Sequence, residues 1–202
     1  MHIDFDYFSF VLASVARDIS ADQIILEAML TKPAHPGKIK RTIQRNKLNT
    51  EILTQLVYIA QNQADSQLQP ISLLSAIESS FSGFDLKNYK FELDRSKPLM
   101  DILADKGIVV SVLRIIFCLL KLENPSLKNV AISFRRRGGY VSMRIVGAKQ
   151  ENPVSYLDDV TALINAIFTN YGAKMEWRIQ KQTRAVFLRL HLAKQISLGY
   201  NS

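Results

Sequence analysis

Arg17 and Asp18 form a charged pair inside an apolar frame that runs from Val11 to Ser20. An arginine guanidinium stays protonated, with a pKa above ~12, so it cannot act as a nucleophile. It can bind a carboxylate or a phosphoryl group through two parallel hydrogen bonds. Asp18 is well placed to orient the Arg17 guanidinium. The pair therefore predicts binding of an anionic group without covalent chemistry.

Other side chains that could act as nucleophiles are few. The chain has three histidines, His2, His35 and His191, and one cysteine, Cys118. His2 lies at the start of the chain, His35 between two prolines, and His191 in a predicted strand. Cys118 stands in an apolar run, which predicts a buried, unreactive thiol. We therefore expect no catalytic residue, no metal site and no cofactor.

The composition predicts a folded protein of a reducing compartment. Of the 202 residues 48% are hydrophobic and 22% are charged, which fits one ordinary domain or two small ones. A single cysteine permits no intrachain disulfide. The longest apolar run, residues 108–122, is shorter than the ~20 residues of a membrane span. With no secretory signal expected at the N-terminus, the prediction is a cytoplasmic protein with no membrane contact.

The net charge of +8 favours an acidic partner. Basic residues cluster at 38–47 and at 135–137, and solvated surfaces account for both clusters. A nucleic-acid-binding protein remains an alternative. No known binding motif and no aromatic residues interleaved with the charges are visible, so we expect nucleic acid not to be a partner.

The first third of the chain predicts a helical hairpin. Apolar spacing indicates helices at residues 4–30 and 38–65, joined by a loop that contains Pro33, Pro36 and Gly37. The first helix carries apolar residues on more than one face, including Ile24, Ile25 and Met29. A single partner helix would leave them exposed to water. We therefore expect a homodimer in which two hairpins form a four-helix bundle.

The remainder of the chain predicts an α+β layer sandwich. Pro70 is expected near the start of a helix. Two strands with alternating apolar residues are joined by a turn at Arg137-Gly138-Gly139, which predicts a hairpin. Gly172 is expected to end a helix. The predicted helices are residues 71–81, 105–122 and 158–171, and the predicted strands are residues 89–93, 130–134, 141–145, 175–179 and 186–192. The domain boundary falls near Pro70, with a hairpin domain at 1–67 and an α+β domain at 68–202.

This order of elements resembles the core of histidine kinases, in which a dimerisation and phosphotransfer bundle precedes an ATP-binding domain of the Hsp90-like kind. The nucleotide-binding positions differ from that pattern. Cys118 stands where the metal-binding asparagine belongs, and Gly147 where the adenine-binding aspartate belongs. Asp158-Asp159 replaces a glycine-rich loop, and Tyr171-Gly172-Ala173 replaces His-Gly-Gly. Two aspartates repel a triphosphate, so these departures imply that ATP is not bound.

Residues 10–20 resemble the phosphoacceptor helix of bacterial histidine phosphotransferases of the alphaproteobacterial type. These proteins join the kinase bundle to a degenerate ATPase-like domain, and they shuttle phosphate between a hybrid kinase's receiver domain and response regulators. Arg17 stands where that family has its phosphoacceptor histidine. The resemblance implies a surface that binds receiver domains, formed by Ala13, Arg17, Asp18, Ser20, Ala21 and Ile24.

The leading hypothesis is therefore a non-catalytic phosphorelay protein of two-component signalling that binds receiver domains. One alternative is an active histidine phosphotransferase that uses a displaced histidine. The other is the basic nucleic-acid-binding protein.

Overall fold

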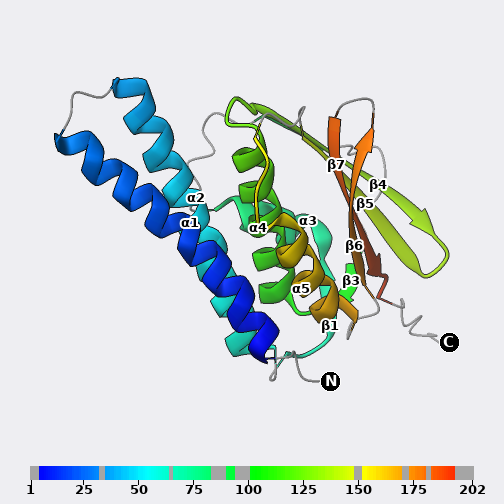
Figure 1. Ribbon diagram of the computed structural model, residues 1–202. Helices are drawn as coiled ribbons and strands as arrows, with labels where there is room; N and C mark the ends of the chain where they lie inside the picture. The colour runs from blue at the N-terminus through cyan, green and yellow to red at the C-terminus, as the bar shows by residue number, and fades with distance from the viewer. Residues whose placement is uncertain are drawn as a thin grey trace, which may run out of the picture.

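The computed structural model describes residues 5–31, 35–63, 66–82, 90–93, 101–147, 152–169, 173–180 and 183–193. Helices and strands are arranged in three layers (Figure 1). The helices are α1 (Phe5–Thr31), α2 (Pro36–Asn62), α3 (Leu73–Phe81), α4 (Lys106–Glu123) and α5 (Leu157–Thr169). The strands are β1 (Gln69–Ser72), β2 (Lys90–Leu93), β3 (Asp101–Ala104), β4 (Asn129–Arg137), β5 (Tyr140–Val146), β6 (Lys174–Gln180) and β7 (Thr183–His191).

A five-stranded sheet forms one outer layer, with the strand order β2-β4-β5-β7-β6. β2 pairs with β4 in parallel, and the other neighbours are antiparallel. β4 and β5 form the predicted hairpin, in which Gly138 adopts a φ of 56° at the turn. A smaller sheet of β1 and β3 adjoins the end of β7 through a bridge between Ile102 and Leu192.

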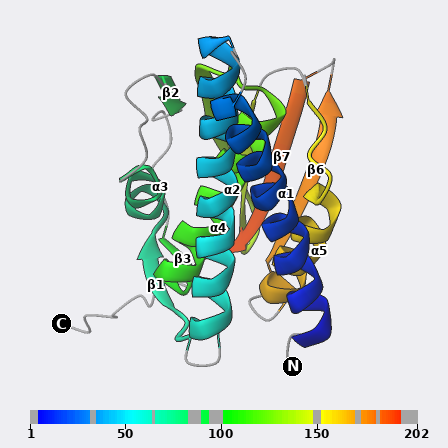
Figure 2. The ribbon, with the colours of Figure 1, turned by 60° about the vertical axis from the view of Figure 1, so that its left-hand side comes forward.

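Helix α4 lies at the centre of the molecule. Asp105 caps its N-terminus by accepting a hydrogen bond from the backbone N–H of Ile108, at 3.0 Å. The helix itself carries buried apolar side chains on nearly every side, which is the pattern of a helix without a solvent face. The sheet covers one side of α4 and α2 packs along the other, while α1 packs against α2 and α5 (Figure 2).

Much of the apolar surface of the hairpin, for which a dimer was predicted, is buried within the chain. Val11 and Val15 of α1 and Ile52 and Leu56 of α2 are fully buried within the chain itself. They belong to one hydrophobic core that also includes α4, α5 and the sheet. The predicted hairpin domain and the predicted α+β domain therefore share a core, and the boundary between them stays a prediction.

Two sequence predictions about the second half were incomplete or wrong. The strands β1 and β3 were not predicted, and α3 begins at Leu73, two residues later than predicted. Pro70 lies in β1 opposite Leu103, and Ser72 is the N-cap of α3. A two-stranded sheet leaves an outer edge free of pairing, where proline's missing N–H costs nothing. The α+β fold class is confirmed. Some residues within or at the ends of the predicted elements lie outside the described residues: Asp4, Asp65, Tyr89, Tyr171 and Gly172.

No helix in the described part of the chain has the length and apolar character needed to cross a membrane.

Candidate functional site: the exposed face of α1 and the cleft beside it

The predicted partner-binding residues fall mostly on one face of α1. Their spacing of three, four and seven residues places them above one another on successive helical turns. Ala13, Arg17, Ser20, Ala21 and Ile24 are all exposed. Phe10 continues the face toward the N-terminus and is 53% exposed, and Ile24 is 66% exposed. The face thus presents one guanidinium among small and apolar side chains.

Asp18 does not belong to this face, which corrects the expected role of its carboxylate. It is half-buried and points toward the loop before α5, where the Ser155 hydroxyl donates a hydrogen bond to Asp18 Oδ2 at 3.4 Å. No ion pair within 4 Å joins Asp18 to Arg17 among the described residues. Asp18 therefore joins the hairpin to the α/β layers and leaves Arg17 available to a partner.

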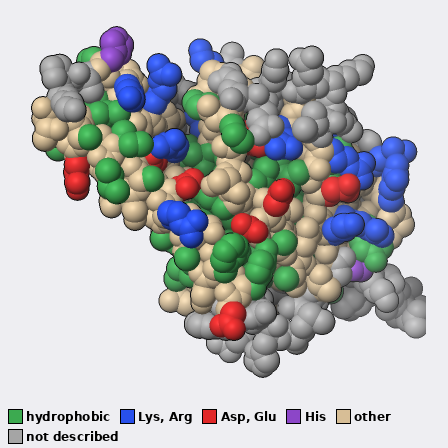
Figure 3. Space-filling model, in the orientation of Figure 1, with side chains coloured by type: hydrophobic (Ala, Val, Ile, Leu, Met, Phe, Trp, Pro, Cys, Tyr) green, Lys and Arg blue, Asp and Glu red, His purple; other side chains and the backbone are tan. Residues whose placement is uncertain are grey.

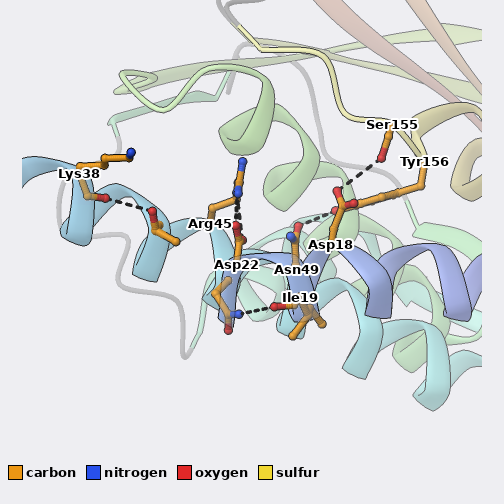
Figure 4. A network of polar contacts seen from close by, with 10 residues as sticks. Asp18, Ile19, Asp22, Lys38, Arg45, Asn49, Ser155 and Tyr156 are labelled. Carbon is orange, nitrogen blue, oxygen red and sulfur yellow. Dashed lines mark hydrogen bonds and ion pairs between the residues drawn. The ribbon is translucent and has the colours of Figure 1, made fainter. Parts of the chain in front are cut away.

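A network of polar contacts continues from Asp18 along the inner side of the hairpin (Figure 4). The fully buried Tyr156 donates a 2.6 Å hydrogen bond to Oδ1 of the buried Asn49 in α2. Burial, with a contribution from the Asp18 carboxylate, raises the pKa of the Tyr156 phenol. The hydroxyl is therefore a neutral hydrogen-bond donor at physiological pH, and its role at this position is structural.

One turn beyond Asp18, a buried carboxylate pairs with an arginine. Asp22 is inaccessible to solvent, and Arg45 Nε lies 2.7 Å and 2.9 Å from its two oxygens. A second Arg45 nitrogen also contacts Asp22, so the pairing is bidentate. The hydrogen bond to Asp22 raises the pKa of the Arg45 guanidinium. This ion pair connects α1 to α2 where the hairpin leaves α4.

A cleft of about 900 Å³ opens between the hairpin and the loops that flank α4 and α5. Its lining is strongly basic, with Lys38, Arg41, Arg45 and Lys121 against the single carboxylate of Asp18. Lys121 also donates a hydrogen bond to the backbone carbonyl of Leu127 at 2.9 Å, and burial lowers the pKa of its ammonium group. The side of α1 next to the Arg17 face therefore borders an electropositive hollow.

The two histidines that the structure describes lie away from the Arg17 face. His35 is exposed at the N-cap of α2, where its Nδ1 accepts a hydrogen bond from the N–H of Gly37 at 3.2 Å. His191 is half-buried at the end of β7, with its ring 4.2 Å from that of Tyr140. Neither residue is on α1, and His2 lies outside the described residues.

The residues that align with the nucleotide-binding positions of histidine kinases have structural surroundings in this chain. Cys118 is completely buried, and burial raises the pKa of its thiol well above the usual value. A side chain at Gly147 would come within 2.8 Å of a Leu120 methyl group. Asp158 and Asp159 lie in the first turn of α5, where their carboxylates interact favourably with the positive end of the helix dipole.

Glu123, at the end of α4, and Arg184 of β7 add a buried bidentate ion pair with a closest distance of 2.7 Å. Within the described residues, no group of three or more His, Cys, Asp or Glu side chains could hold a metal ion.

Sequence reasoning missed the pairing of Asp22 with Arg45 and that of Asn49 with Tyr156. The two pairs are separated by 23 and 107 residues along the chain, so no local spacing connects them. The available signal was polar side chains inside otherwise apolar helical stretches, since buried polar groups require partners.

Solved structures of histidine kinases match this fold. The histidine kinase AdeS of Acinetobacter baumannii aligns over 87% of this chain and 95% of its own, with a TM-score of 0.53 and 12% sequence identity. The histidine kinase ThkA, in complex with the response regulator protein TrrA, aligns over 90% of this chain and 60% of its own, with a TM-score of 0.55 and 13% identity. No protein-family model and no curated protein sequence matches the chain. At these identities the likeness establishes the histidine-kinase-like fold alone.

Proposed function

We propose that this protein is a non-catalytic component of two-component signalling that binds receiver domains of response regulators through the exposed face of α1. The observation that carries the proposal is the position of Arg17. It is exposed in the middle of a hairpin helix of a histidine-kinase-like fold, on a face of small and apolar side chains. By this binding, the protein would sequester receiver domains or compete for them with an active phosphotransferase.

The chemistry of the α1 face fits a receiver domain. Receiver domains carry a cluster of acidic residues, which a protein of net charge +8 attracts. Ala13 and Ala21 allow close approach of another backbone, and Ile24 offers apolar area. Arg17 then supplies a directional bond to a carboxylate or a phosphoryl group. The solved complex of ThkA with TrrA is a precedent for a protein of this fold that binds a response regulator.

The absence of phosphotransfer is part of the proposal. A phosphoryl group moves from a receiver aspartate to a neutral imidazole, and a permanently protonated guanidinium cannot accept it. The proposed function also involves no binding of ATP. Cys118 offers no oxygen ligand to magnesium, and Asp158 and Asp159 place negative charge where a phosphate would need positive charge.

We further propose that the protein is a homodimer. The end of the hairpin projects beyond α4 and leaves large apolar side chains in water (Figure 1). Leu30 is 88% exposed and Ile43 is 41% exposed. Pairing two such ends would bury this surface in the manner of a four-helix bundle. The double variant Leu30→Glu/Ile43→Glu should sediment as a monomer while the wild type sediments as a dimer. A monomeric wild type at micromolar concentration would contradict the proposal.

The function is tested by measuring binding to purified receiver domains from the same organism. Titration calorimetry across that set should identify at least one receiver that binds, and Arg17→Glu should weaken that binding at least tenfold. Arg136→Glu is the matched control, since Arg136 is also exposed but lies on β4, and it should bind as the wild type does. Unchanged receiver binding by the Arg17→Glu protein would remove this face from the proposal.

A second measurement distinguishes the alternative of an active phosphotransferase. Incubation with a phosphorylated receiver should leave no acid-labile phosphate on the wild-type chain. Acid-labile phosphate that disappears in His35→Ala would instead identify a displaced phosphoacceptor.

A further inference from the structure

The five-stranded sheet has two very different faces. One packs against α4 and α5 and is apolar, with Ile132, Met143 and Leu188 among its buried side chains. The opposite face is open and forms a groove of about 630 Å³ over β4, β5, β7 and β6. Six cationic side chains and one carboxylate line this groove: Arg135, Arg137, Arg144, Lys174, Arg178, Arg189 and Glu176. Figure 3 shows Lys and Arg side chains gathered on the sheet side of the molecule, at the right.

The strand register places three of these cations in one row across the sheet. Arg135 pairs with Ser142, Ser142 with Arg189, and Arg189 with Lys174. Adjacent strands lie about 4.8 Å apart, so Lys174 and Arg189 are immediate neighbours. Like charges directly opposite each other destabilise a sheet. None of the three forms an ion pair within 4 Å in the described part of the chain, so their charge is available to an anion.

Aromatic rings lie among these cations. The Arg189 guanidinium carbon is 3.8 Å from the centroid of the Tyr140 ring, and that of Arg178 is 4.9 Å from the centroid of Phe187. Arg144 lies 5.9 Å from the same Phe187 centroid. The expectation that no aromatic residue is interleaved with the basic residues is therefore wrong for the sheet. Strand pairing brings β5 and β7 together, although α5 and β6 lie between them in the sequence.

We propose that this open sheet face binds single-stranded nucleic acid. A single strand presents phosphates in succession, which match a row of cations, and bases with exposed planar faces. Aromatic rings and guanidinium planes both stack on such bases. An acidic protein surface would match the charges, but it does not by itself present flat rings at regular spacing, as the successive bases of a strand do beside their phosphates. The combination of a charge row and stacking planes on one sheet therefore favours the nucleic acid. This site is separate from the α1 face, and the proposal does not depend on receiver binding.

The probe is a fluorescein-labelled 20-mer of deoxythymidine, measured by fluorescence anisotropy with the full chain at several salt concentrations. The wild type should bind with a micromolar dissociation constant at 50 mM salt and lose affinity as salt rises. Arg135→Gln/Arg189→Gln should weaken binding at least tenfold. Because each phosphate contact contributes about 0.7 to the log–log salt slope for single strands, this variant should lower the slope by about 1.4.

The matched control is Lys106→Gln/Lys128→Gln, which removes the same charge from exposed positions outside the groove, at the start of α4 and after its end. It should bind the oligonucleotide within twofold of the wild type. An equal loss in both double variants would mean that net charge alone drives binding, and it would overturn the proposed site. Failure of the wild type to bind at 50 mM salt would overturn it as well.

Phe187→Leu separates stacking from charge, since it keeps an apolar side chain and removes the ring. It should weaken oligonucleotide binding several-fold with an unchanged salt slope, and thermal melting would verify that the variant folds. Polyglutamate and phosphatidylserine vesicles serve as competing anions. If either binds more tightly than the oligonucleotide at the same salt, the sheet serves an acidic protein or a membrane surface and the proposal is wrong.

Discussion

The two halves of the helical hairpin bury very different amounts of apolar surface. In the half that covers α4, Val11, Val15, Ile52 and Leu56 are fully buried. In the projecting half, Leu30 is 88% exposed. The same pair of helices therefore contributes to the core at one end and offers a contact surface at the other. Arg17 lies where the two halves meet, on the side that faces water.

The largest expected difference concerns matched leucines in the two halves. Leu56→Ala removes a fully buried side chain between the hairpin and α4, and should lower the free energy of unfolding by about 2 to 5 kcal/mol. Leu30→Ala, at a position exposed within the chain, should change it by less than about 0.5 kcal/mol when the protein is dilute enough to be monomeric. Urea denaturation of both variants measures this. Similar losses would mean that the projecting half is packed within the chain.

A smaller effect is expected at the ion pair between the halves. Arg45→Met leaves the Asp22 carboxylate buried without its partner, which is costly. Because Arg45 is itself half-exposed, water can partly replace it, and we expect a loss of about 2 kcal/mol. Arg41→Met, at an exposed position on the same helix, should have almost no effect on thermal stability. If the two variants have the same melting temperature, the ion pair does not stabilise the hairpin.

The contact between the hairpin and the α/β layers should contribute less again. Tyr156→Phe removes the donor to Asn49 and leaves a buried amide oxygen unsatisfied, which should cost about 1.5 kcal/mol. Tyr58→Phe, where the ring is 40% exposed, is the control and should be close to neutral. Chemical denaturation with both variants would show whether this hydrogen bond holds the hairpin against the loop before α5. Equal stability would contradict that role.

The fold class followed from the sequence because apolar spacing identifies helices and strands without tertiary information. The rotation of α1 was less predictable. Leu12 and Ile19 continue the apolar spacing of Phe8 and Val15 but are only half-buried, whereas Val11, off that spacing, is fully buried. That rotation depends on where α4 and α5 lie, which a local pattern does not contain. β1 buries only Ile71, and β3 buries only Ile102 and Ala104, which are too few side chains for alternation to reveal a strand.

The candidate sites differ in the same way. The exposed position of Arg17 follows from its place off the apolar spacing of Phe8, Leu12, Val15 and Ile19. The contact of Asp18 with Ser155 joins residues 137 positions apart, so the sequence suggested Arg17 as its partner instead. On the sheet, the alternation of Arg135 and Arg137 is visible in the sequence. The neighbours that β7 and β6 supply, Arg189 and Lys174, depend on the strand order.

The central claim is that a receiver domain binds the exposed face of α1. Hydrogen–deuterium exchange of the chain, with and without a saturating receiver domain, tests it most directly. The account predicts slower exchange in peptides that cover residues 13–24 and unchanged exchange in β6 and β7. Receiver binding that leaves residues 13–24 unprotected would contradict it.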